Sequence, residues 1–271
     1  MQCFIFHSGQ SLERRHLINI KKLTLVIGLL LLFNSCAKNV ADKNNDLGSG
    51  DRSNLPVSLK SLIEHAEYCK DIYDSGGDQK DEVAFEVKQD NGISIIVIRG
   101  TANDANVLSD VDVRLVSDTR TGIKLHKGFR DVAVNIMQII DTTKTLEHSV
   151  HVTGHSLGGA VAQIIGMWLH KRGKNVQVFS YGSPKVSSQV LDSQPTHWRV
   201  VRRSDPIPFT PPWPYRHTGL FIDSQDLDWG PDNDNGLISK TDGLTHAISK
   251  YVSTLKAVDY LINGSKTKYK N

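Results

Sequence analysis

The sequence predicts an α/β fold, in which a mostly parallel central sheet is flanked by helices. Over residues 55–262, short apolar runs alternate with segments that carry apolar residues at helical spacing, a pattern typical of such sheets. The run Ile93–Ile98 is almost continuously apolar and β-branched, as expected of a strand buried on both faces. The 271 residues are 39% hydrophobic and 23% charged, which excludes disorder or fibrous repeats as the main content.

The expected elements follow one another along this domain. Leu55–Tyr73 has helical spacing, with Pro56 near its start, where a missing N–H is tolerated. Four further elements are expected before the middle of the chain, namely strands at Val83–Val87, Ile93–Ile98 and Val111–Leu115 and a helix at Phe129–Ile140. The second half is expected to contain strand Val150–Thr153, helix Ala160–Leu169, strands Val176–Tyr181 and Trp198–Val201, and a closing amphipathic helix at Ala247–Ile262.

Residues 1–35 are expected to be a signal peptide. A basic stretch, Arg14–Lys22, precedes the mostly apolar run of 11 residues Leu23–Phe33, which is too short for a bilayer-spanning helix of about 20 residues. The following Ser35-Cys36 resembles a bacterial lipobox and predicts Cys36 as the lipidated first mature residue; a simple cleaved signal or an uncleaved anchor is the alternative. Residues 36–54 read as a flexible tether, and 55–271 as the folded domain.

Charge and cysteine usage agree with export. The net charge of +3 resides in residues 1–35, and the rest of the chain carries equal numbers of acidic and basic residues. Nucleic acid is therefore not an expected partner, because its binding requires a cationic surface. Beyond Cys3 and Cys36 only Cys69 remains, so neither an internal disulfide nor a zinc site is expected. The protein is predicted to be a membrane-anchored lipoprotein facing the periplasm or cell exterior, otherwise secreted.

The motif that carries chemistry is Gly154-His155-Ser156-Leu157-Gly158. It lies between an expected strand and an expected helix, as a nucleophile elbow requires. We expect Ser156 to have a strained backbone, and Gly154 and Gly158 to be needed because a Cβ would strike neighbouring backbone. The N–H of Leu157, at the start of the helix, is placed to stabilise an oxyanion. A plain strand-to-helix turn is the alternative interpretation.

This motif is one of six blocks that follow one another along the chain: Ile98–Thr101, His126–Phe129, Gly154–Ala160, Tyr181–Val186, Asp205–Pro208, and His246 with Tyr251. Together they resemble the class 3 (fungal-type) lipase family of α/β-hydrolases over about residues 60–260. The resemblance implies hydrolysis of lipid esters by a Ser-Asp-His triad without a cofactor or metal. It also implies that Thr101 is an oxyanion residue, for which capping of a strand end is the alternative.

The resemblance implies Asp205 as the triad acid, in a loop stiffened by Pro206 and Pro208. Of the eleven histidines, only His217 and His246 follow it, as the Ser, Asp, His order of this fold demands. His246 is the predicted base because it precedes the last helix, whereas His217 leads into an expected strand. We interpret His126 as structural.

The chain also departs from the family. Residues 102–110 are short and polar, where the family usually has a lid helix and a Trp, so a large lid is not expected. The segment 232–236 has only a weak likeness to a calcium loop. Residues Pro211–Pro214, which include Trp213, are expected to form an apolar wall beside the site, or else to pack in the core.

Three functions compete. The leading one is a lipase or esterase acting on lipid or small esters. The second is a phospholipase or acyltransferase on the same fold, because the acyl-enzyme is shared and only the acceptor differs. The third is a membrane-tethered binding module with an inactive site. The oligomeric state is not predictable from the sequence.

Overall fold

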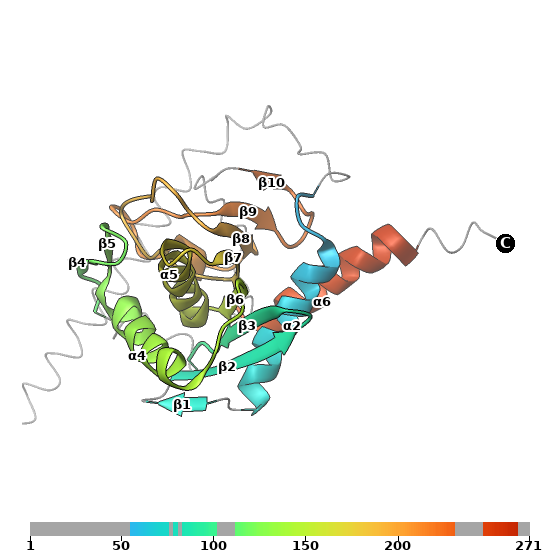
Figure 1. Cartoon of the computed structure of the whole chain (residues 1–271). Helices are drawn as coiled ribbons and strands as arrows, with labels where there is room; N and C mark the ends of the chain where they lie inside the picture. The colour runs from blue at the N-terminus through green and yellow to red at the C-terminus, as the bar shows by residue number, and fades with distance from the viewer. Residues whose placement is uncertain (1–54, 76–77, 81–82, 102–111, 231–245, 265–271) are drawn as a thin grey trace, which may run out of the picture. The chain divides into compact units, whose positions relative to one another are not determined.

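The computed structural model describes residues 55–75, 78–80, 83–101, 112–230 and 246–264 (Figure 1). All of them belong to one compact unit, Ser49–Asn271. The predicted signal peptide, Cys36, the tether, the segment 102–110 and the segment 232–236 lie outside the described residues. Within the described ranges, no helix combines the length and apolar character needed to cross a membrane.

The centre of the domain is an eight-stranded sheet with the order β1-β2-β3-β6-β7-β8-β9-β10. Its strands are β1 (Asp78–Lys80), β2 (Val83–Asp90), β3 (Ile93–Ile98), β6 (Ser149–His155), β7 (Asn175–Tyr181), β8 (Thr196–Val201), β9 (Leu220–Asp223) and β10 (Trp229–Gly230). The five central strands from β3 to β9 pair in parallel, and the outer pairs are antiparallel. The mostly parallel sheet predicted from the sequence is therefore confirmed.

Helices cover both faces of this sheet (Figure 1). On one face lie α4 (Lys127–Thr143) and α5 (Leu157–Lys171), and on the other lie α2 (Leu59–Ser75) and α6 (Ile248–Asp259). A short 3-10 helix, η3 (Ile207–Phe209), follows β8, and a π-helical turn, η4 (Tyr260–Gly264), follows α6. The predicted closing helix is thus α-helical only as far as Asp259.

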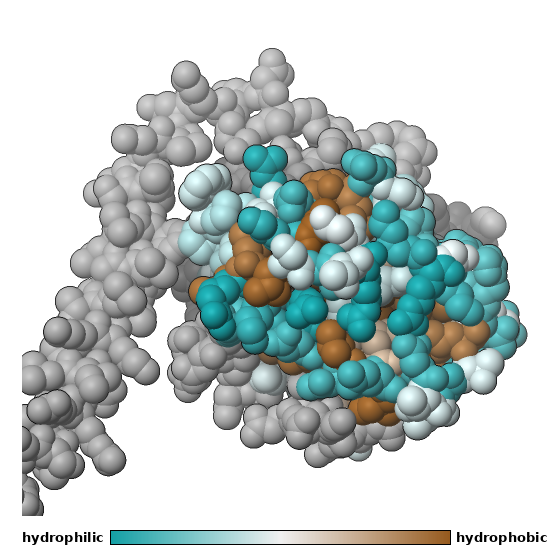
Figure 2. Space-filling model, turned by 60° about the vertical axis from the view of Figure 1, so that its left-hand side comes forward, coloured by the Kyte–Doolittle hydropathy of each residue, from teal (hydrophilic) through white to brown (hydrophobic). Residues whose placement is uncertain are grey.

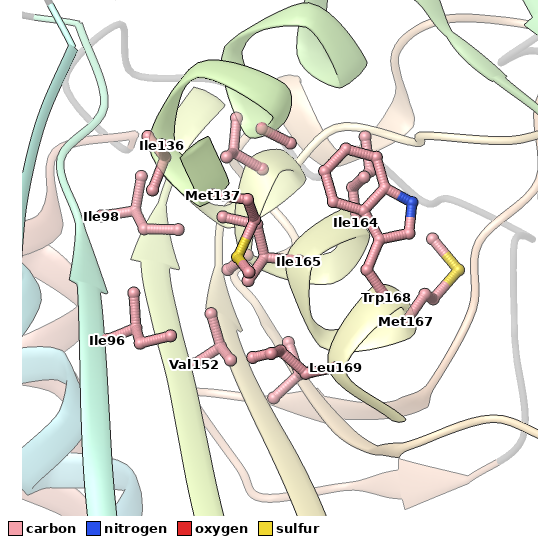
Figure 3. Packing of buried hydrophobic residues seen from close by; sticks show 14 of the residues in the cluster. Ile96, Ile98, Ile136, Met137, Val152, Ile164, Ile165, Met167, Trp168 and Leu169 are labelled. Atoms are coloured by element: carbon pink, nitrogen blue, oxygen red, sulfur yellow. The ribbon is translucent and has the colours of Figure 1, made fainter. Parts of the chain in front are cut away.

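The core between the sheet and α5 is apolar and consists largely of branched aliphatic side chains. Val150 and Val152 of β6 point toward α5, together with Ile96 and Ile98 of β3. The close-up in Figure 3 shows Ile96, Ile98 and Val152 facing Met137 of α4 and the α5 side chains Ile164, Ile165 and Leu169. Burial of this apolar area is the main source of stability, because the described part of the chain contains no disulfide.

The expected strand at Val111–Leu115 is wrong in its position. The strand there, β4 (Leu115–Ser117), begins at the last of these residues and pairs with β5 (Lys124–His126). The residues before it instead meet the start of α4: the backbone N–H groups of Lys127 and Gly128 donate to the carbonyls of Arg114 and Asp112. These bonds satisfy the N–H groups that the first turn of a helix leaves unpaired.

Candidate active site

Ser156 lies in a sharp turn between β6 and α5. Its φ and ψ are 57° and −128°, a left-handed conformation that is strained for a residue with a Cβ. A Cβ added at Gly154 would overlap the backbone of Gly158, and one at Gly158 would overlap the carbonyl oxygen of Ile98. The predicted strain at Ser156 and the need for both glycines are therefore confirmed, which makes the segment a nucleophile elbow in geometry.

A buried carboxylate and an imidazole meet nearby. Asp205 is fully buried in the loop after β8, and its Oδ2 lies 2.7 Å from Nδ1 of His246. The same oxygen accepts a 2.6 Å hydrogen bond from the hydroxyl of Tyr251 on α6, and Oδ1 accepts one of 2.9 Å from the N–H of Ile207. Burial and the charge of Asp205 raise the pKa of Tyr251 well above its usual value, so this hydroxyl remains a donor.

Gly182, just after β7, packs closely against this pair. Its φ is +57°, and an added Cβ would lie 2.8 Å from Asp205 Oδ2, 2.9 Å from Tyr251 Oη and 3.1 Å from His246 Cε1. Only glycine combines this conformation with so close an approach. The sequence interpretation gave Gly182 no role; the signal was present in the Tyr181–Val186 block, but only the tertiary contacts reveal what the glycine does.

A second missed residue is His155, which precedes Ser156. Its Nε2 lies 2.7 Å from the carbonyl oxygen of His246, and its Nδ1 lies 3.0 Å from the hydroxyl of Tyr73 on α2. Burial, and to a lesser degree the neighbouring His246, lower the pKa of His155 well below its usual value. The ring is therefore neutral and carries one proton. Because a carbonyl can only accept, that proton is on Nε2, and Nδ1 accepts from Tyr73.

Thr101 Oγ1 and His246 Nε2, at this end of the sheet, are among the side-chain polar atoms that are buried without a hydrogen-bond partner in the described part of the chain. Thr101 follows β3, and the neighbouring Gly100 is close enough to Ser156 that an added Cβ would lie 3.2 Å from the serine Cβ. Leu157 begins α5, whose first N–H groups have no intrahelical acceptor. Unsatisfied buried groups are costly, so Thr101 Oγ1 and His246 Nε2 favour a further hydrogen-bond partner.

The remaining candidates are placed as follows. His217 is buried, but the carboxylate of Asp205 has His246, Tyr251 and the Ile207 N–H as its partners within the described chain. His126 caps α4, because its Nδ1 accepts the N–H of Phe129 at 3.5 Å. No three His, Cys, Asp or Glu side chains in the described ranges are grouped to hold a metal ion. Trp213 is 86% exposed, so packing in the core is wrong for this residue.

This fold and these side chains define a class. A mostly parallel sheet with a serine at a strand–helix elbow, beside a buried Asp–His pair, is the α/β-hydrolase arrangement. Residues 95–215 match the family model described as lipase (class 3).

Individual relatives point the same way. The chain is 33% identical to the secreted mono- and diacylglycerol lipase 1 of Fusarium solani over 150 residues, which is 49% of this chain and 45% of the relative. It is 27% identical to a lipase of Rhizomucor miehei over 61% of this chain and 51% of that one. The chain therefore spans about half the length of these curated relatives.

Among solved structures, the lipase of Rhizopus microsporus var. chinensis superposes with a TM-score of 0.53. The sequence identity is 19%, and the match covers 77% of this chain and 96% of that one. At this identity the likeness concerns the fold alone.

Proposed function

We propose that the chain is a serine hydrolase of carboxylic esters that acts on lipid esters, as a triacylglycerol lipase or esterase. One observation carries the proposal: the strained Ser156 elbow lies beside an Asp205–His246 pair 2.7 Å apart, and the outer nitrogen of that imidazole has no partner among the described residues. The names of the relatives, which are lipases, support the same substrate class.

Ser156 is the nucleophile, His246 the general base and Asp205 the group that orients the base. Ser156 Oγ attacks the ester carbonyl carbon while its proton passes to His246 Nε2. The oxyanion accepts hydrogen bonds from the Leu157 N–H and from Thr101. Its collapse breaks the bond to the alcohol oxygen, which takes the proton from His246. Water then attacks the acyl-enzyme by the same route, releasing the acid and restoring Ser156, so no cofactor is required.

The test is turnover of p-nitrophenyl esters over a range of acyl lengths, with Ser156→Ala as the control. Hydrolysis that Ser156→Ala abolishes is expected. Folded wild-type protein without activity on any ester would favour the inactive binding module. Phospholipid hydrolysis, or acyl transfer to an added alcohol, measured in the same protein separates the phospholipase and acyltransferase alternatives, since each differs only in the leaving or accepting alcohol.

We propose further, from the sequence alone, that residues 1–35 direct export and that Cys36 carries a lipid which tethers the 55–271 domain to a membrane through residues 36–54. The short apolar run and the cysteine that follows it support this assignment. Incorporation of labelled palmitate into wild-type protein but not into Cys36→Ser is expected. Equal membrane partitioning of the two proteins would contradict it.

A further inference from the structure

The loop after η3 presents an exposed tryptophan. Trp213 is 86% exposed, more than any other large apolar side chain in the described residues. It is flanked by Pro211, Pro212 and Pro214, whose fixed φ angles restrict the backbone of the loop. A water-exposed indole of this kind contributes no core packing, so its position requires another explanation.

The loop is anchored at both ends. Before the tryptophan, the carbonyl of Thr210 accepts the N–H of Lys185 at 2.7 Å, and after it the N–H of Arg216 donates to the carbonyl of Ser187 at 2.8 Å. The buried Tyr215 donates its hydroxyl to the carbonyl of Val113. Trp213 is therefore held out from the surface by a fixed scaffold, because the backbone on either side of it is bonded to neighbouring segments.

This scaffold belongs to the edge of the sheet that carries the active site. The segments from 182 to 187 and from 202 to 216 follow the carboxyl ends of β7 and β8, as Ser156 follows that of β6. Val113, which Tyr215 contacts, is 54% exposed. Figure 2 turns the side with β4 and β5 toward the viewer and shows apolar patches there among hydrophilic residues. The active site and the two exposed apolar side chains thus share one edge.

The chemistry of these side chains fits one kind of partner. An indole has an apolar body and a polar N–H, which favour the boundary between acyl chains and water. Two arginines adjoin the apolar side chains: Arg114, which is 72% exposed and ion-paired with Asp112, follows Val113, and the exposed Arg216 follows Tyr215. Such cations remain at the level of lipid headgroups while neighbouring apolar groups enter the lipid.

We propose that Trp213, together with the exposed Val113 on the segment that Tyr215 contacts, inserts into the surface of a lipid aggregate and holds the active-site edge at the lipid–water interface. The inference rests on the proposed function, because a lipid-ester hydrolase must bring its active site to the lipid surface. Contact with the interface then comes from the loop after Asp205 and does not depend on a lid.

The direct test is quenching of tryptophan fluorescence by vesicles of dibrominated phosphatidylcholine, with unbrominated vesicles as reference. Trp168 is buried, and Trp198 and Trp229 are half-buried, so the quenched emission is expected to come from Trp213 and to be lost in Trp213→Phe. Equal quenching of the two proteins, or none in the wild type, overturns the proposal; the latter would leave a protein as the partner of this surface.

A second measurement compares hydrolysis of an emulsified long-chain triester with that of a dissolved short-chain ester. Trp213→Ala is expected to lower the ratio of the two rates about tenfold or more, since a large apolar area no longer enters lipid, while the rate on the dissolved ester stays unchanged. Tyr260→Ala, which removes a 70% exposed aromatic side chain on η4, is the matched control and should leave the ratio unaltered.

The outcomes separate the two proposals. An unchanged ratio in Trp213→Ala overturns the interfacial role even when the enzyme is active. If instead the wild-type protein hydrolyses no ester but shows quenching that depends on Trp213, the proposed function fails and the lipid-binding surface stands.

Discussion

The two faces of the central sheet are built in opposite ways, and β6 shows the contrast within one strand. Its Val150 and Val152 point toward α5 into an apolar core. Its alternate residues His151, Thr153 and His155 point toward α2 and form hydrogen bonds with it.

On α2 the partners are His65, Cys69 and Tyr73, at 3.0 Å from His151, 3.2 Å from Thr153 and 3.0 Å from His155, respectively. We call these three pairs the α2–β6 ladder. The spacing of the partners explains why it forms: four residues of a helix rise about 6 Å and two residues of a strand about 6.6 Å.

The two faces of the sheet therefore contribute in different ways to the fold. The α5 face stabilises the fold through non-directional burial, which tolerates changes of shape within limits. The α2 face fixes orientations, because each polar atom requires its own partner. The last pair of the ladder ends at the active site, since His155 also bonds the carbonyl of His246. The apolar packing thus lies on the α5 side of β6, whereas the directional contacts on its α2 side reach the Asp205–His246 pair.

The largest expected effect is the loss of stability in acid, to which the α2 face contributes together with the buried His126, His197 and His217, whose pKa values burial also lowers. Burial lowers the pKa of His65 to about 4 and also lowers that of His151 and, further, of His155, although Glu64 opposes the shift at His151. Below pH 6.5 the unfolded chain binds more protons than the folded one, so the unfolding free energy falls as pH drops from about 6.5 toward 4. For His65 the contribution approaches about 1.4 kcal/mol per pH unit within this range.

Urea unfolding at pH 7, 6 and 5 measures the slope of the unfolding free energy against pH. Replacing both members of one ladder pair, His65→Phe with His151→Leu, should flatten it. An unchanged slope in that variant would place the acid sensitivity elsewhere.

The next effect concerns Gly182. Gly182→Ala should lower kcat about 10²-fold or more, because the new Cβ displaces Asp205, Tyr251 or His246, and small misplacements of catalytic groups are that costly. Steady-state kinetics with circular dichroism on the same sample measures it. A folded variant with wild-type kcat would show that the Asp205–His246 geometry is not limiting.

The ladder itself provides a matched pair of variants. His155→Phe should lower kcat about tenfold to a hundredfold with little change in KM, because it removes the bond that holds the His246 carbonyl. Cys69→Val, which removes the middle pair, should lower the unfolding free energy by about 1–3 kcal/mol and leave kcat unchanged. Equal effects of both changes on kcat would mean that the ladder acts only through overall stability.

The smallest effect is expected on the α5 face. Ile165→Val removes one buried methylene from the core and should lower the unfolding free energy by about 0.5–1.5 kcal/mol. Activity per folded molecule should not change, because no polar contact of the active site is involved. Thermal unfolding and active-site titration give the two quantities; a drop in specific activity would show that the two faces are coupled.

The features that the sequence could predict are those that depend on residues close together in the chain. The strands, the helices and the Ser156 elbow depend on neighbours in the chain, and their patterns are visible in the printed order of residues. The contact of His155 with Tyr73 joins residues 82 apart, and that with His246 joins residues 91 apart, so no local pattern records them. The short strands β1 and β10 were missed for a related reason, since strands at the edges of a sheet need only brief pairing.

The most direct test of the catalytic assignment is to label the folded protein with a fluorophosphonate and to map the modified residue by mass spectrometry. Modification of Ser156 is expected, together with a loss of about 10⁶-fold in kcat for both Ser156→Ala and His246→Ala, whereas His217→Ala should keep most of the activity. Modification of a different serine, or undiminished turnover by Ser156→Ala, would contradict the assignment.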